Sequence, residues 1–196
     1  MYEHSKYKNF IIYKMQTECD CVPTCVVSIL NSLGEDYDLK KAINLATEKG
    51  YLYFPEFFES DFDKLYNPEG VKCGMDPGKI PFFVKDLTDG KYKARLKTDE
   101  IGSLRYDPEE RTRLVSENML EIISRYYIEI LSKEEMPLIV GLEGESLDHS
   151  VVLFEINNNV VYGDPKDGLV IKMNKKDFRK DFNSLSIKIE KSEKPD

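Results

Sequence analysis

The chain has 196 residues, of which 41% are hydrophobic, so it can bury a core of ordinary size as a single globular domain. Its formal net charge is −8 and its charges are dispersed, which argues against a nucleic-acid partner because such partners require clustered cations. The start of the chain is polar without the apolar core of a signal peptide, and no apolar stretch reaches the ~20 residues that span a bilayer, so we expect a cytoplasmic protein with reduced thiols and no membrane insertion.

The first predicted element is a buried helix that begins near Cys21. Apolar residues at positions 26, 29, 30 and 33 have the spacing of one helix face, and Gly34 ends the pattern. Pro23 suits the first turn, where its missing N–H costs nothing, so Asp20 or Cys21 is expected at the cap. Because a helix N-terminus stabilises an anion, a thiolate is favoured at Cys21.

The middle of the chain is predicted to be mainly helical. Asp38 is the expected N-cap of a helix over 39–49 that ends at Gly50. The stretch from Tyr51 to Tyr66 mixes aromatic and acidic residues, and we expect it to pack over the core, although an exposed segment of this kind would suit the wall of a substrate groove. Further along we predict a helix over 80–87, a strand over 92–96 and one long helix over 108–132.

The last third of the chain is predicted to form strands, over 137–142, 150–156, 159–163, 168–173 and 184–190, with a short helix over 175–182. His149 leads the first strand of a hairpin, and Asp164 ends the second. Positions at the same end of two antiparallel strands are neighbours, so the Asp164 carboxylate is expected to orient the His149 ring. Helices followed by an antiparallel sheet predict an α+β fold, with the site where the two halves meet.

Cys21, His149 and Asp164 thus appear in the order of a nucleophile, a base and a base-orienting acid. Taken singly, each has an ordinary structural interpretation as a buried cysteine, a strand-end histidine and a turn aspartate. Their occurrence together favours covalent thiol chemistry. A structural zinc site is disfavoured, because such sites usually take their four ligands in closely spaced pairs and this sequence lacks that spacing. The possible ligands are Cys19, Cys21, Cys25, Cys73, His4 and His149.

The motifs resemble one known family. They are Asp20-Cys21-Val22-Pro23-Thr24-Cys25 before an apolar helix, then Pro137-Leu138-Ile139-Val140-Gly141, Asp148-His149-Ser150-Val151-Val152-Leu153 and Gly163-Asp164-Pro165. This order resembles the papain-like peptidases that process bacteriocin leaders after a Gly-Gly pair. The resemblance covers nearly the whole chain and implies a single papain-like domain over 1–190, followed by a polar tail over 191–196.

By this resemblance Cys21 looks like the nucleophile, His149 the general base, Asp164 its orienting acid and Gln16 the side-chain donor of the oxyanion hole. The implied function is hydrolysis of a peptide bond through a thioester, with a peptide or protein as partner and without a cofactor. The exporter activity of the transporters that carry such domains is not implied, because no Walker-type Gly-rich loop occurs in this sequence.

Two alternatives stay open. The same residues would permit deamidation or acyl transfer, because all three reactions pass through one thioester. Val22 stands where the family commonly has glycine, and a bulky residue beside the nucleophile would suit a catalytically inactive module that only binds peptides.

Overall fold

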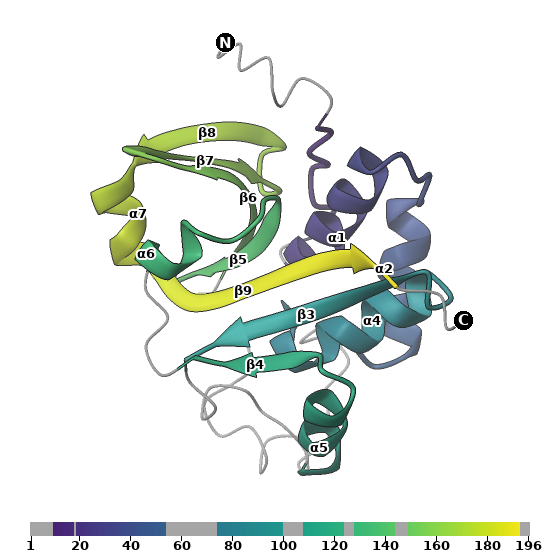
Figure 1. The fold of residues 1–196 in the computed structure, drawn as a ribbon. Coiled ribbons are helices and arrows are strands. Elements are labelled where there is room, and N and C mark those ends of the chain that lie inside the picture. The colour runs from purple at the N-terminus through teal and green to yellow at the C-terminus, as the bar shows by residue number, and fades with distance from the viewer. Residues whose placement is uncertain are drawn as a thin grey trace, which may run out of the picture.

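The structure is a computed structural model that describes residues 10–17, 19–53, 74–99, 108–123, 128–143 and 149–192 (Figure 1). Its helices are α1 (Cys21–Ser32), α2 (Leu39–Glu48), the 3-10 turn η3 (Pro77–Lys79), α4 (Ile80–Leu87), α5 (Pro108–Ser116), α6 (Ile128–Leu131) and α7 (Lys175–Asp181). Its strands are β1 (Leu52–Tyr53), β2 (Gly74–Met75), β3 (Tyr92–Thr98), β4 (Leu120–Ile122), β5 (Leu138–Leu142), β6 (His149–Ile156), β7 (Asn159–Asp164), β8 (Leu169–Asn174) and β9 (Phe182–Lys191).

One mostly antiparallel sheet organises the chain. Its described strands lie in the order β4-β3-β9-β5-β6-β7-β8, and the pair of β3 with β4 is parallel. Helix α1 packs against β6 and α4 against β3, with α2 beside both helices, whereas α6 and α7 lie against the curved half formed by β5 to β8 (Figure 1). This arrangement confirms the predicted α+β fold, with the helix of Cys21 on one side and a late sheet on the other.

The sheet separates two clusters of buried side chains. On β5, Ile139 packs into the cluster that contains α1, α2 and α4, whereas Leu138 and Val140 pack with α6 and α7. Successive side chains of a strand point to opposite faces, so a strand that is covered on both sides must be apolar throughout. The uninterrupted apolar runs of β5 and β6 follow from this double cover.

Most of the predicted elements are confirmed, including the helix over 80–87 and the five late strands. Asp38 caps α2, because its side chain accepts a hydrogen bond from the Lys41 N–H at 2.8 Å. Gly34 follows α1 at φ 90°, as its role as terminator requires. Of the aromatic and acidic stretch over 51–66, only the first three residues lie in the described part, and so do only the first two residues of the predicted tail over 191–196.

The predicted single helix over 108–132 is wrong. α5 ends at Ser116, Asn118 adopts a left-handed backbone at φ 54°, and Leu120 begins β4, where it pairs with Leu96 of β3. Helical periodicity could not reveal this, because a parallel partner strand is distant in sequence.

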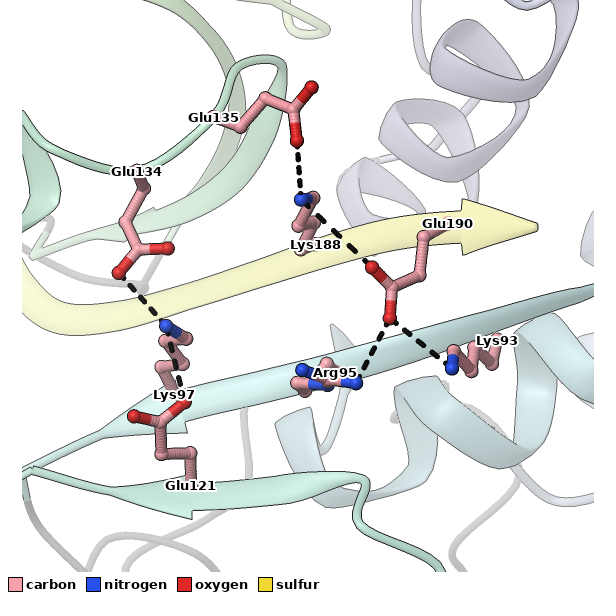
Figure 2. A network of polar contacts seen from close by, with 8 residues as sticks. All are labelled: Lys93, Arg95, Lys97, Glu121, Glu134, Glu135, Lys188 and Glu190. Carbon is pink, nitrogen blue, oxygen red and sulfur yellow. Dashed lines mark hydrogen bonds and ion pairs between the residues drawn. The ribbon is translucent and has the colours of Figure 1, made fainter. Parts of the chain in front are cut away.

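The outward face of β3 and β9 carries a network of ion pairs (Figure 2). Lys97 contacts Glu121 of β4 at 3.1 Å and Glu134 at 2.9 Å. Lys188 of β9 contacts Glu135 at 2.7 Å, and the remaining members are Lys93, Arg95 and Glu190. The network therefore joins the edge strand and the segment before β5 to the middle of the sheet.

None of the described helices combines the length and apolar composition that crossing a membrane requires.

Candidate active site

Cys21 is the first residue of α1, the most deeply buried helix of the described chain. Every residue from Cys21 to Leu30 is buried, and Cys21 itself is 8% exposed as a free thiol. The helix packs against β6, so the start of α1 lies beside the sheet that carries the two other candidate residues. Val22 is 4% exposed and belongs to the core cluster with α2 and α4.

His149 and Asp164 meet at one end of the sheet. His149 begins β6 and Asp164 ends β7, in a register that places Val152 opposite Gly163. Asp164 therefore lies diagonally across from His149, within reach of long side chains. The His149 Nε2 and the Asp164 Oδ1 are 2.7 Å apart, so the predicted contact between these two side chains is present.

The turn after β7 holds the Asp164 carboxylate in place. Its Oδ1 also accepts a hydrogen bond from the Lys166 N–H at 2.8 Å, and the Asp164 carbonyl accepts one from Gly168 N–H at 2.9 Å. Gly168 has φ 68°, a left-handed conformation that glycine adopts without strain. The Gly-Asp-Pro turn thus orients the carboxylate toward the histidine.

The electrostatics favour a charged pair of His149 and Asp164. Burial lowers the pKa of His149, but hydrogen bonds with Asp164 and Cys21, together with the charges of both, outweigh it and raise the pKa from 6.5 to about 9. Burial raises the pKa of Asp164, yet the hydrogen bonds from His149 and Lys166 outweigh that effect and hold the pKa below its ordinary 3.8. An imidazolium beside an ionised carboxylate is therefore the dominant state near neutral pH.

The ring nitrogens of His149 serve different partners. Because Nε2 is engaged by Asp164, Nδ1 is the nitrogen available to the Cys21 sulfur. The His149 ring thus interacts with both of the other predicted residues, with the Asp164 carboxylate at 2.7 Å and with the Cys21 thiol.

A second cysteine links the helix to the same strand. The Cys25 thiol donates a hydrogen bond to the Ser150 carbonyl at 3.4 Å, one residue after His149. Burial, followed by the nearby Cys21 and Asp164, raises the pKa of Cys25 well above 9.0. Cys25 is consequently a neutral thiol that packs in the core.

Asp20 is the N-cap residue of α1, as predicted, but its side chain has other partners. Asp20 occupies the position before the helix, but its side chain makes no capping bond to the first turn. Its Oδ2 instead accepts from the Gln16 N–H at 2.9 Å, and its Oδ1 accepts from the Thr17 N–H at 3.0 Å. The carboxylate thus points back along the chain, to N–H groups three and four residues earlier.

Gln16 lies in this preceding segment, with an exposed side chain and a backbone N–H held by Asp20. The sequence places it five residues before Cys21. Its role as an oxyanion donor stays a prediction.

Cys19 is disulfide-bonded, whereas Cys21 and Cys25 are free. The expectation of reduced cysteines throughout is therefore wrong for Cys19. Sequence spacing could not show this, because pairing depends on which distant segments the fold brings to within about 6 Å of each other. Among the described residues, no group of three or more histidine, cysteine or acidic side chains could hold a metal ion.

The fold is that of known peptidase domains. The peptidase domain of Streptococcus ComA, a bi-functional ABC transporter involved in a quorum sensing pathway, matches with a TM-score of 0.53 and 16% identity over 93% of this chain and 99% of that domain. A double glycine motif protease from an AMS/PCAT transporter, crystallised in complex with the leader peptide, matches with a TM-score of 0.56 and 14% identity over 93% of this chain and 91% of that one.

Sequence similarity points to the same group. The sublancin-168-processing and transport ATP-binding protein SunT of Bacillus subtilis (strain 168) is 32% identical over 78 residues, and its counterpart in Bacillus phage SPbeta gives the same values. The match covers 39% of this chain and 11% of those transporters. No protein-family model matches the chain. The predicted resemblance to double-glycine leader peptidases is thus confirmed in the fold.

Proposed function

We propose that this chain is a cysteine peptidase that cleaves a peptide bond, with Cys21 as nucleophile, His149 as general acid and base, and Asp164 as the group that orients the ring. The observation that carries the proposal is His149, whose Nε2 lies 2.7 Å from Asp164 while the ring is also hydrogen-bonded to Cys21. A histidine held between a free thiol and a carboxylate is the arrangement that nucleophilic thiol catalysis requires.

In the proposed reaction the Cys21 thiolate attacks the carbonyl carbon of the scissile bond, and the carbonyl oxygen becomes an oxyanion. The tetrahedral intermediate collapses as the C–N bond breaks, and the leaving amine takes the proton from His149 Nδ1. A thioester to Cys21 remains. His149, now neutral, removes a proton from water as the water oxygen attacks the thioester carbonyl. The C–S bond then breaks, which releases the carboxylic acid and restores the Cys21 thiolate beside the protonated ring.

Asp164 acts on the ring throughout this cycle. Its ionised carboxylate keeps the Nε2–H directed away from the thiol, so that Nδ1 faces the reacting atoms. The backbone N–H of Cys21 and the side chain of Gln16 are the proposed donors to the oxyanion.

A peptide substrate is favoured by the relatives. One similar domain was crystallised with a leader peptide, and SunT is described as processing sublancin 168. We propose a peptide or protein substrate for this chain by that analogy. Deamidation and acyl transfer use the same thioester and stay as the second candidate.

A non-catalytic peptide-binding module is less well supported. That alternative rests on Val22 crowding the nucleophile, whereas Val22 is 4% exposed and packs into the core cluster with α2 and α4.

Thiol labelling tests the catalytic pair. A thiol-reactive probe is expected to label Cys21 rapidly in the wild type and at least about tenfold more slowly in His149→Ala, because the ring that supports the thiolate is gone. Cys25 is the internal control, since its buried and protonated thiol should stay unlabelled in both. Equal labelling of Cys21 in the two proteins would rule out the proposed pair.

The substrate class requires a second experiment. Comparison of protein N-termini between cells that contain the wild type and cells that contain Cys21→Ala should reveal new termini that depend on the thiol. Thiol-dependent conversion of glutamine to glutamate without new termini would favour deamidation instead.

A further inference from the structure

We infer that Asp20 is a positioning residue for the reaction proposed above, holding the segment that carries Gln16 against the start of the nucleophile helix. Both carboxylate oxygens are used. Oδ2 accepts from the Gln16 N–H at 2.9 Å, and Oδ1 accepts from the Thr17 N–H at 3.0 Å and from its hydroxyl at 3.3 Å. The inference rests on the proposed function for its catalytic consequence.

The burial of Asp20 indicates that these hydrogen bonds stabilise its carboxylate. Asp20 is 0% exposed, and a carboxylate without water is stable only when hydrogen bonds replace its hydration. Bonds to an ionised acceptor are stronger than neutral ones. Because the Asp20 side chain does not cap α1, its hydrogen bonds to the preceding segment offset the free-energy cost of burying the carboxylate.

The segment held by Asp20 crosses between the two halves of the site. Residues 10–17 run from α1 to the turn that follows Asp164. Met15 N–H donates to the Pro165 carbonyl at 2.8 Å, directly after the proposed orienting acid. Tyr13 N–H donates to the Ser28 hydroxyl of α1 at 3.1 Å. We call residues 10–17 the strap.

Close packing fixes the strap at a further point. Gly163 lies one residue before Asp164, and a Cβ there would overlap the side chain of Ile12. The strap is therefore tied to the helix of the nucleophile and to the turn of the acid, and Asp20 fixes its end beside Cys21.

The position of the strap matters for the proposed role of Gln16 in catalysis. Gln16 can donate to an oxyanion at Cys21 only if its backbone has a fixed position relative to the sulfur, and Asp20 supplies that restraint from the adjacent residue. Loss of the Asp20 carboxylate should therefore affect the same step as loss of the Gln16 side chain, lowering kcat more than it changes KM.

The experiment combines hydrogen exchange with kinetics. In Asp20→Asn the Gln16 and Thr17 amides are expected to exchange faster than in the wild type, while the amides of α1 keep their protection. Asp38→Asn is the matched control, because Asp38 accepts from the Lys41 N–H at the exposed start of α2. That variant should speed exchange at Lys41 and leave Gln16, Thr17 and kcat unchanged.

For cleavage of a peptide substrate, Gln16→Ala is expected to lower kcat by about 10²- to 10³-fold, the usual effect of removing one oxyanion donor. Asp20→Asn should lower kcat by a similar factor or less, and the double variant should be no slower than the slower single variant. Full additivity of the two effects would overturn the inference, and so would unchanged amide exchange at Gln16 and Thr17.

Thr17→Val covers the case in which Asp20→Asn fails to fold. Thr17 is exposed, and the change removes only its hydroxyl bond to Asp20 and the one that it accepts from the Cys19 N–H. We expect faster exchange at the same two amides and a kcat about twofold to tenfold lower. If the wild type cleaves no peptide, the proposed function fails, while the exchange measurements still decide whether Asp20 holds the strap.

Discussion

At the scale of single residues, the candidate site is defined by the shared ring of His149. Its contact with Asp164 is direct, and that contact explains why the two residues perturb each other's pKa in opposite directions. A raised histidine pKa and a lowered aspartate pKa both favour the charged pair. The same pair would keep a proton ready for a leaving group over the physiological pH range.

The pH dependence of catalysis follows from the His149 pKa of about 9. We expect kcat/KM for peptide cleavage to fall as pH rises through about 9, because His149 then loses the proton that the leaving amine needs. A pH profile of kcat/KM measures this directly. A basic limb centred near the ordinary histidine value of 6.5 would contradict the environment described here.

Stability should depend on pH through the same residue. A histidine whose pKa rises from 6.5 to about 9 on folding contributes stability that is fully present below 6.5 and is lost as pH rises through about 9. The contribution is at most a few kcal/mol, since one pKa unit corresponds to about 1.4 kcal/mol. Urea unfolding of wild type and His149→Gln should therefore converge between pH 6.5 and about 9, and a constant difference would contradict this.

Asp164→Asn tests the orienting acid. We expect a loss of about 10²- to 10⁴-fold in kcat, because the amide neither stabilises the imidazolium nor enforces the correct ring tautomer. The matched control is Asp167→Asn, an exposed aspartate in the same turn, which should leave kcat unchanged. The basic limb of the pH profile should also move to lower pH in Asp164→Asn alone.

At the scale of elements, the site depends on the packing of α1 against β6. The nucleophile candidate is the first residue of the helix, the base candidate is the first residue of the strand, and the Cys25 thiol joins the two elements at the Ser150 carbonyl. Both elements are apolar on nearly every side, since α1 is surrounded by core and β6 is covered on both faces. Rigid, fully covered elements hold side chains more precisely than loops do.

The break between α5 and β4 gives a prediction at this scale. Asn118 adopts φ 54°, where glycine is unstrained and β-branched residues are strongly disfavoured. Asn118→Gly should leave the free energy of unfolding nearly unchanged, whereas Asn118→Val should lower it by about 1–3 kcal/mol in a urea titration. Equal stability of the two variants would argue for a continuous helix through this position.

At the scale of the whole molecule, the sheet joins a helical half to a strand half. β9 lies between β3 and β5, so the last described strand links the early strand of the helical half to the hairpin that carries His149 and Asp164. The ion pairs of Figure 2 lie on the face of β3 and β9 and connect these two strands to β4 and to the segment before β5.

Lys97 is the member of that network with the clearest expected effect. Its side chain is 18% exposed and that of Glu134 is 19% exposed, so Lys97→Met would leave a largely buried carboxylate without its partner. We expect a loss of about 1–3 kcal/mol in the free energy of unfolding. Lys180→Met removes the exposed pair with Asp177 and should change stability by less than about 0.5 kcal/mol. Similar losses of stability in both variants would contradict the expectation that the buried ion pair contributes more than the exposed one.

The sequence by itself determined the local elements and the order of the three candidate residues. Helix starts and strand alternation are written in neighbouring residues, which is why α1, α2, α4 and the late hairpin could be predicted. The contact of His149 with Asp164 was predictable as well, because a hairpin makes nearby residues meet.

Only the tertiary structure decided what depends on partners distant in the chain. The parallel pairing of β4 with β3, the position of β9 inside the sheet and the disulfide bond of Cys19 are examples. Asp20 is a further example, because it lies at the predicted cap position but its side chain accepts from the Gln16 and Thr17 N–H groups of the strap. A carboxylate at such a position can accept hydrogen bonds from several nearby N–H groups. Which of them it binds depends on the packing around it, and that packing involves residues from the whole fold.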